Sequence, residues 1–179
     1  MKYIKLYENF ENVLPDEVYN KIKLKPDSRI VTSNDEELKF KYYVFEDHVP
    51  SSAQKTGHKP NGIWYGIGTQ WIDYVRLSMP NWEKKNAFEI ELNKQNILFI
   101  TNDDELWEFN NKWGVKTQDG SFVKYKTYID WKGVSEQYDG IEISPFSDDG
   151  RSDYWWYYPW DVASGCIWKM SAFKKITKL

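Results

Sequence analysis

Six aromatic residues occupy the seven positions from Tyr154 to Trp160, and only Pro159 interrupts them. Side chains leave alternate faces of a strand, so a strand this rich in rings cannot point all of them into one core. We therefore expect some of these rings to line a cleft or an interface. The alternative is a half-buried sheet whose outer rings cover a neighbouring loop.

A carboxylate and several small residues follow this aromatic segment. Asp161 comes directly after Trp160, and Ala163, Ser164 and Gly165 come next. An aromatic wall beside one acid suits a flat heterocycle or a sugar, held by stacking and fixed by the carboxylate. We expect Tyr157, Trp160 and Ser164 to contact the ligand, with Asp161 as the acid. Glu142 and Asp139 are further candidates for the acid, although Asp139-Gly140 is also a common turn sequence.

Length and charge exclude several classes of protein. A chain of 179 residues predicts a single domain over 1–179, because it is too short for two ordinary cores. Lys and Arg total 24 against 27 Asp and Glu, and this net charge of -3 argues against binding to duplex nucleic acid. No apolar run reaches the roughly 20 residues of a membrane span, so we expect no membrane partner. The charged start of the chain and the single cysteine, Cys166, predict a cytoplasmic protein.

The hydrophobic pattern predicts a mixed α+β domain with two or three helices and six to eight short strands. No linker divides the chain, but 1–61 is expected to form an N-terminal part with a long loop at 47–61, and 62–176 the core. We expect a polar loop at 148–153. Helices are predicted at about 16–22, 69–79 and 102–113, with a capped turn of helix at 130–134. Strands are predicted at 29–33, 39–46, 62–67, 87–92, 96–100, 141–143 and 166–168.

Metal and nucleophile chemistry find little support. His48 and His58 are the only histidines and belong to no metal-binding motif, so no metal site is predicted. Cys166 lies in an apolar strand, where a small core residue is expected. Gly66 ends a strand just before a helix, where free backbone N–H groups would allow an anion to approach closely; tight turns packed under neighbouring rings are the alternative.

The order of the elements resembles the ADP-ribosyltransferase fold, a split, mostly antiparallel β-sandwich around a cleft for NAD. The residues that carry the resemblance span about two thirds of the chain. They are 62–66 leading into the helix at Trp71, then 88–92, 138–143, 165–168 and 171–174. The block 160–168 is also similar to small proteins of bacteria and their viruses.

The resemblance implies a role for several residues. It places Trp64 and Tyr65 near the nicotinamide ring, and Arg29 or His58 near the phosphates and ribose of NAD. An acid before a late strand would stabilise the oxocarbenium-like transition state as nicotinamide leaves. Asp161 is our first choice for this acid, with Glu142 second. The chain departs from the family pattern at Gly165, where many members carry a glutamate.

Three functions follow as expectations. The first is an enzyme that transfers ADP-ribose from NAD, bound between Trp64/Tyr65 and the segment 157–164, to a protein or nucleic-acid target. The second is a non-catalytic module whose aromatic cleft binds a nucleotide, a sugar or single-stranded nucleic acid. The third is a small inhibitor or adaptor of bacterial-virus type whose exposed rings bind a host protein.

Overall fold

The structure is a computed structural model that describes residues 12–40, 58–116 and 127–179. Its helices are α1 (Asp16–Lys23), α2 (Gln70–Ser78), α3 (Asp103–Trp113), α4 (Trp131–Gln137) and α5 (Asp148–Asp153), with short 3-10 turns η2 (Pro80–Trp82), η3 (Lys94–Asn96) and η4 (Met170–Ala172). Its strands are β1 (Arg29–Ser33), β2 (Ile63–Ile67), β3 (Asn86–Leu92), β4 (Ile97–Ile100), β5 (Gly114–Lys116), β6 (Thr127–Ile129), β7 (Gly140–Ile143), β8 (Ser164–Ile167) and β9 (Phe173–Lys178). The α+β class predicted from the sequence is confirmed.

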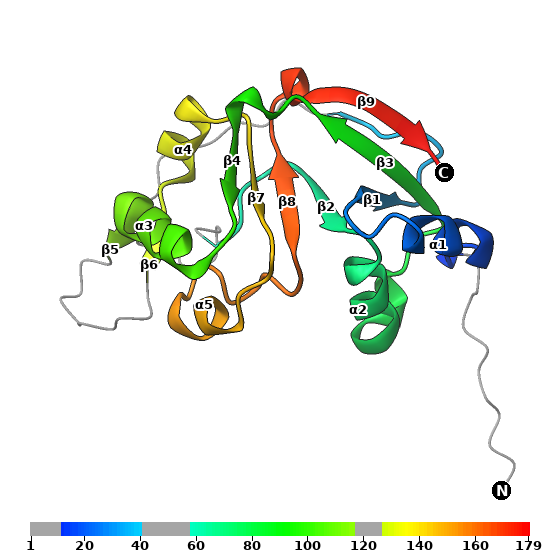
Figure 1. The fold of residues 1–179 in the computed structure, drawn as a ribbon, viewed down its shortest axis with the longest axis horizontal. Helices are drawn as coiled ribbons and strands as arrows, with labels where there is room; N and C mark the ends of the chain where they lie inside the picture. Colours follow the sequence, from blue (N-terminus) through cyan, green and yellow to red (C-terminus); the bar gives the residue numbers. More distant parts are fainter. Residues whose placement is uncertain (1–11, 41–57, 117–126) are drawn as a thin grey trace, which may run out of the picture.

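Seven strands form one curled sheet in the order β4-β7-β8-β2-β1-β3-β9 (Figure 1). Only β4 and β7 pair in parallel, so the predicted antiparallel character is also confirmed. β5 and β6 form a separate two-stranded sheet. The described part therefore differs from the expected sandwich: it has one curled seven-stranded sheet, and five α-helices where two or three were expected.

Local signals explain most of the helix boundaries. α3 begins where the Asn102 side chain accepts a hydrogen bond from the Glu105 N–H at 2.9 Å, and α4 begins where Asp130 accepts from the Gly133 N–H at 2.9 Å. Thr69 makes no such cap at α2, and Gly114 does not end α3 in a left-handed turn, since its φ of -69° leads straight into β5. The sequence predicts Thr69 as the cap of α2 and Gly114 as the left-handed residue that ends α3, and both predictions are wrong.

Three further expectations need correction or lie outside the described residues. The predicted polar loop 148–153 is α5, which Ser147 caps by accepting from the Gly150 N–H at 2.8 Å. β9 was not predicted. The predicted strand 39–46 and loop 47–61 lie mostly outside the described residues, and the described 39–40 are not in a strand.

Strand register gives the seven-stranded sheet two distinct faces. Ile30, Gly66 and Ser164 stand opposite one another across β1, β2 and β8, and so share one face. The neighbouring trio Tyr65, Gly165 and Glu142 is also in register, across β2, β8 and β7, and lies on the other face. Helices cover the two ends of the molecule, with α3, α4 and α5 at one end and α1 and α2 at the other (Figure 1).

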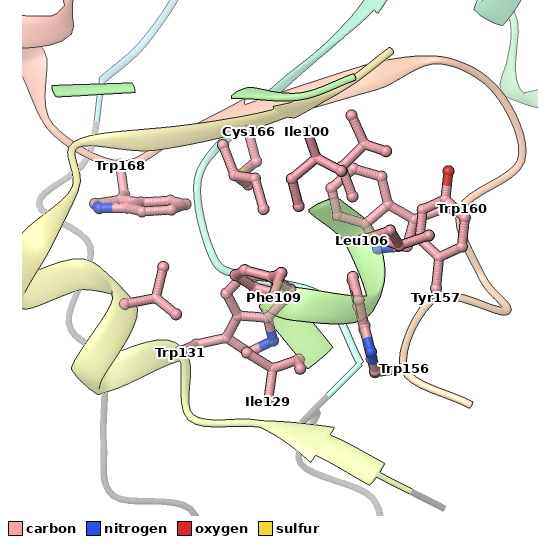
Figure 2. Close-up of a cluster of buried hydrophobic side chains, with 13 residues drawn as sticks. Ile100, Leu106, Phe109, Ile129, Trp131, Trp156, Tyr157, Trp160, Cys166 and Trp168 are labelled. Atoms are coloured by element: carbon pink, nitrogen blue, oxygen red, sulfur yellow. The ribbon is translucent and has the colours of Figure 1, made fainter. Parts of the chain in front are cut away.

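The aromatic segment packs into the core instead of forming a strand. Trp156, Tyr157 and Trp160 have no exposed surface, while Trp155 and Tyr158 are 45% and 56% exposed. The segment runs through consecutive turns, in which neighbouring side chains need not alternate between two faces, so the strand argument does not apply to it. The three buried rings join a cluster (Figure 2) that consists of Ile100, Leu106, Phe109, Ile129, Trp131, Val134, Ile141, Ile143, Trp156, Tyr157, Trp160, Cys166 and Trp168.

Candidate functional site

A cleft of about 340 Å³ opens on the sheet face that carries Ile30, Gly66 and Ser164. One side comes from α2 and η2, and the other comes from the chain that leads into β8. We call it the tryptophan cleft. It is lined by Ile30, Thr32, Lys59, Trp64, Tyr65, Gly66, Trp71, Trp82, Lys84, Asp161, Val162 and Ser164.

The structure brings half of the predicted site residues to this cleft. Trp64, Tyr65, Gly66, Asp161 and Ser164 all line it. The other lining residues were not predicted as site residues, and those with an aromatic or charged side chain are Trp71, Trp82, Lys59 and Lys84. Trp71 was assigned to the apolar face of a helix, and the other three stand in irregular segments where no periodic pattern singles them out. The aromatic content of 62–82 was the signal that could have found the tryptophans.

Gly66 allows α2 to approach the sheet. A Cβ on residue 66 would lie 2.7 Å from the Cβ of Trp71, which is closer than two such carbons can stand. Because residue 66 has no side chain, the Trp71 ring can sit beside β2, where it also stacks on Tyr74 at 5.8 Å between ring centres. Gly66, which was expected to let an anion approach the backbone, instead lets Trp71 pack against β2.

A partly buried ion pair connects the residue after Trp82 to α2. Arg76 donates from Nε to Glu83 at 2.7 Å and from a terminal nitrogen to the Leu14 carbonyl at 3.0 Å. Glu83 also accepts from the Leu14 N–H at 3.3 Å. Since Glu83 follows Trp82 directly, this clamp joins η2, α2 and the chain before α1 into one wall of the cleft.

Asp161 is held by two neighbours that both contact one oxygen of its carboxylate. It accepts from the Tyr74 hydroxyl at 3.1 Å and from Arg151 at 3.3 Å. Burial, followed by this hydrogen bond and the charge of Asp161, raises the pKa of Tyr74, so the phenol stays a donor at neutral pH. Arg151 balances the negative charge of Asp161, and its guanidinium also lies over the exposed Tyr158 ring at 5.3 Å.

Lys59 lies over the face of Trp64, with Nζ 4.9 Å from the ring centre. Burial lowers the pKa of Lys59, and the nearby Asp161 charge opposes this effect. The Trp64 ring also packs edge-to-face with the Trp160 ring, and the two ring centres are 4.8 Å apart. Trp160 therefore backs a wall of the cleft but does not line it.

Arg29 and Glu142 lie on the other face of the sheet. Arg29 donates to both carboxylate oxygens of Glu142, at 2.5 and 2.9 Å, and the Tyr65 hydroxyl donates to Glu142 at 2.8 Å. Glu142 is only 7% exposed. The Tyr65 phenol, whose pKa burial and Glu142 raise well above its ordinary value, therefore points away from the tryptophan cleft. Glu142, the second candidate acid, therefore pairs with Arg29, which was expected to contact the phosphates of NAD. Both lie on the face of the sheet opposite the cleft that Asp161 lines.

The remaining predicted residues lie outside the cleft lining. Tyr157 is fully buried, burial raises its pKa to about 12, and its hydroxyl accepts from the Ser147 N–H at 3.3 Å. His58 packs against the Tyr128 and Trp155 rings at 5.4 and 5.7 Å. Cys166 is buried in the core, and burial raises the pKa of its thiol well above the ordinary value.

Among the described residues no group of three or more His, Cys, Asp or Glu side chains could hold a metal ion. In the same part of the chain, every helix is too short or too polar to cross a bilayer. Comparison of the chain with protein-family models, with curated proteins and with solved structures finds no match. The resemblance to the ADP-ribosyltransferase fold therefore stays a prediction.

Proposed function

We propose that the tryptophan cleft binds a planar heterocycle, such as a nucleobase or a nicotinamide ring. The observation that carries the proposal is that Trp64, Trp71 and Trp82 come from three different elements and line one open cavity of about 340 Å³. Ligand sites are typically concave, largely apolar and lined by aromatic residues with a few polar groups. Stacking of a base on an aromatic side chain contributes about 1–3 kcal/mol per base.

Polar groups at the cleft can orient a ligand that stacks on the tryptophans. Thr32 and Ser164 carry hydroxyls at the lining, and the Ser164 hydroxyl donates to the Val162 carbonyl at 3.0 Å, so that oxygen can still accept. Asp161 offers its second carboxylate oxygen, because its contacts with the described residues Tyr74 and Arg151 both engage the other one. A ring N–H or a sugar hydroxyl of the ligand is a suitable donor to it.

The environment of Asp161 supports binding more than group transfer. An acid that stabilises an oxocarbenium-like transition state acts through its net negative charge. Here Arg151 compensates that charge within 3.3 Å, and Glu142 lies on the opposite face of the sheet, where it pairs with Arg29. The non-catalytic module is therefore the function we favour, and transfer of ADP-ribose from NAD is a further activity to be tested on the same protein.

Calorimetric titration with adenine, nicotinamide, adenosine and NAD tests the proposal. Trp82 and Trp107 are both 58% exposed, but only Trp82 lines the cleft, so Trp82→Leu and Trp107→Leu form a matched pair. We expect saturable binding of at least one heterocycle, weakened about tenfold by Trp82→Leu and unchanged by Trp107→Leu. Absence of binding by all four compounds, or an equal loss in both variants, would overturn the proposal.

Incubation of the protein with labelled NAD and a bacterial extract tests transfer separately. Label transferred by the native chain and lost in Asp161→Asn, while NAD binding persists, would make the protein an ADP-ribosyltransferase. Binding of NAD without any transferred label would leave it a binding module.

A further inference from the structure

We infer that the ligand of the tryptophan cleft is anionic, with a phosphate or an equivalent group held by Lys59 and Lys84, so that the cleft takes one nucleoside monophosphate. This inference rests on the proposed function, because it assigns a charge and a size to the ligand of the same site. Three independent observations lead to it: the charges at the cleft, the rigidity of the segment carrying Lys84, and the cavity volume.

The charges at the cleft leave an excess of positive groups. Lys59 and Lys84 line it, and neither forms an ion pair with a carboxylate in the described part of the chain. The one lining acid, Asp161, is already balanced by Arg151. The cleft is thus positive although the whole chain carries a net charge of -3. An anion is the ligand that complements such a site.

Lys59 is also partly withdrawn from water. Its ammonium sits on the Trp64 ring, and burial makes its charged form less favourable, as the lowered pKa shows. The charge of Asp161 offsets this cost only in part, because the pKa stays lowered and Asp161 is paired with Arg151. A bound phosphate would add a second negative charge and form charge-assisted hydrogen bonds with the amine.

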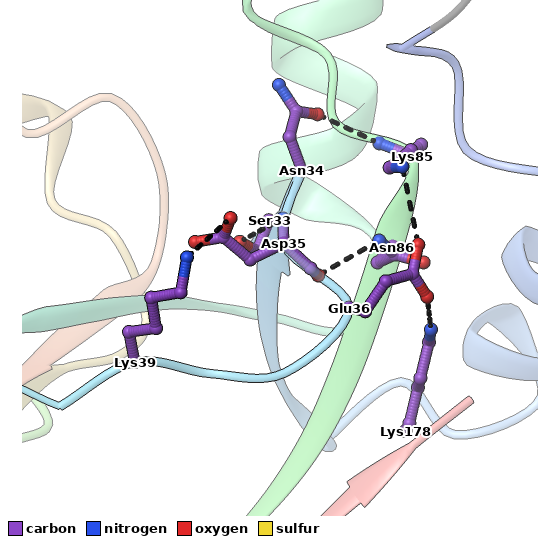
Figure 3. A network of polar contacts seen from close by, with 8 residues as sticks. All are labelled: Ser33, Asn34, Asp35, Glu36, Lys39, Lys85, Asn86 and Lys178. Carbon is purple, nitrogen blue, oxygen red and sulfur yellow. Dashed lines mark hydrogen bonds and ion pairs between the residues drawn. The ribbon is translucent and has the colours of Figure 1, made fainter.

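The segment that carries Lys84 is fixed by a polar network on the neighbouring residues (Figure 3). The Lys85 N–H donates to Asn34 at 3.3 Å, and the Lys85 side chain pairs with Glu36 at 3.3 Å. Asn86 donates to the Asp35 carbonyl at 2.9 Å. These contacts hold residues 85 and 86 against the chain that follows β1. The backbone of Lys84 is thereby positioned before any ligand arrives, which lowers the entropic cost of binding.

The volume argues for a single nucleotide. Ligand pockets span about 300–1,000 Å³, and the cleft, at about 340 Å³, is near the small end of that range. One base with its sugar and phosphate suits a cavity of that size. A dinucleotide such as NAD would keep one of its two halves outside, so it should gain little affinity over a mononucleotide.

Calorimetry with adenosine and adenosine monophosphate tests this inference. Lys112 is a matched control for Lys59, because it lies over Trp113 at 4.7 Å but is not at the cleft. We expect the monophosphate to bind at least tenfold more tightly than adenosine in the native protein. Lys59→Met and Lys84→Met should each remove about tenfold of the affinity for the monophosphate and should weaken adenosine binding by a clearly smaller factor. Lys112→Met should change neither.

Three different results would overturn the inference in different ways. Equal affinities for adenosine and its monophosphate, with both saturable, would overturn the anionic ligand and leave the proposed function intact. No binding of either compound would overturn both. NAD binding more than tenfold tighter than the monophosphate would overturn the assignment of size.

Discussion

The ring of Tyr65 lies against the backbone of Gly165 where β2 crosses to β8. A Cβ placed on residue 165 would lie 2.3 Å from both Cζ and the hydroxyl oxygen of Tyr65, and 2.7 Å from the Ile141 carbonyl oxygen. The glycine therefore lets the phenol pass over β8 and donate to Glu142 on β7. Gly165, where the family that the chain resembles often carries a glutamate, is a site of close packing.

Gly165→Ala should destabilise the fold by about 3 kcal/mol or more, because both the aromatic ring and a backbone oxygen would have to move. Urea denaturation of the variant and the native protein measures this difference. Tyr65→Phe keeps the ring and loses only the hydrogen bond to Glu142, so it should cost about 1–2 kcal/mol. A Gly165→Ala variant that is less destabilised than Tyr65→Phe would contradict the packing explanation.

Glu142 should act in stability and not at the cleft. Arg29→Met leaves the carboxylate of Glu142 buried without its cation, and we expect a loss of about 3 kcal/mol in the free energy of unfolding. The double variant Arg29→Met/Glu142→Leu should recover part of that loss, since no charge is then left unpaired. Affinity for a nucleotide should change less than twofold in Glu142→Gln, measured by calorimetry. A large loss of affinity in that variant would return Glu142 to the binding site.

Sequence reasoning succeeded where one local rule determined the outcome. Asn102 and Asp130 have the side chains that cap helices, and the alternation of Phe88, Ile90 and Leu92 with two glutamates marks a half-buried strand. Alternation along a strand also predicts which face of the sheet each side chain lies on. The alternation in 141–143 likewise predicts that Glu142 faces away from its neighbours Ile141 and Ile143, and the register of β7 agrees.

It failed where the outcome depended on distant parts of the chain. The aromatic segment packs as turns because α3 and α4 provide rings that receive it, such as Phe109 and Trp131, and nothing within 154–160 reveals this. The cleft collects Lys59, Trp82 and Lys84 from irregular segments whose proximity depends on the whole sheet. Asp161 and Trp64 could be anticipated because each belongs to a local pattern. Asp161 directly follows the aromatic segment 154–160, and Trp64 stands near the start of the predicted strand 62–67.

Trp156 and Trp160 are both completely buried but differ in their hydrogen bonds. The Trp156 indole donates to the Asn110 side chain at 3.0 Å, whereas the Trp160 indole nitrogen has no partner among the described residues. Trp156→Phe should therefore cost about 1 kcal/mol more than Trp160→Phe, because only the first substitution removes a hydrogen bond. Chemical denaturation of the two variants measures the difference. A Trp160→Phe loss equal to or above that of Trp156→Phe would show that packing alone decides.

Glu36 should make the stability depend on pH in the acidic range. Hydrogen bonds from Lys178 and then Lys85 lower its pKa from 4.5 to about 2 (Figure 3). A carboxyl whose pKa is lowered by folding stabilises the protein above its unfolded pKa, and this contribution is lost as the pH falls through the folded pKa. The difference in Tm between native protein and Glu36→Gln should therefore be constant above pH 5 and shrink from about pH 4.5 to 2. Because Glu36 is exposed, added salt should reduce the difference. A difference that grows on acidification would contradict the assignment.

Lys59 should make nucleotide binding sensitive to alkaline pH. Burial places its pKa below 10.5, so its charge is lost at a lower pH than that of an exposed lysine. The neighbouring Cys166 thiol, whose pKa burial raises well above its ordinary value, keeps its proton over this range and adds no charge beside Lys59. Affinity for adenosine monophosphate should therefore fall over this range in the native protein. Lys59→Arg, which stays charged throughout, should retain more of its affinity at pH 10. Parallel pH profiles for the two proteins would show that the amine of Lys59 does not hold the phosphate.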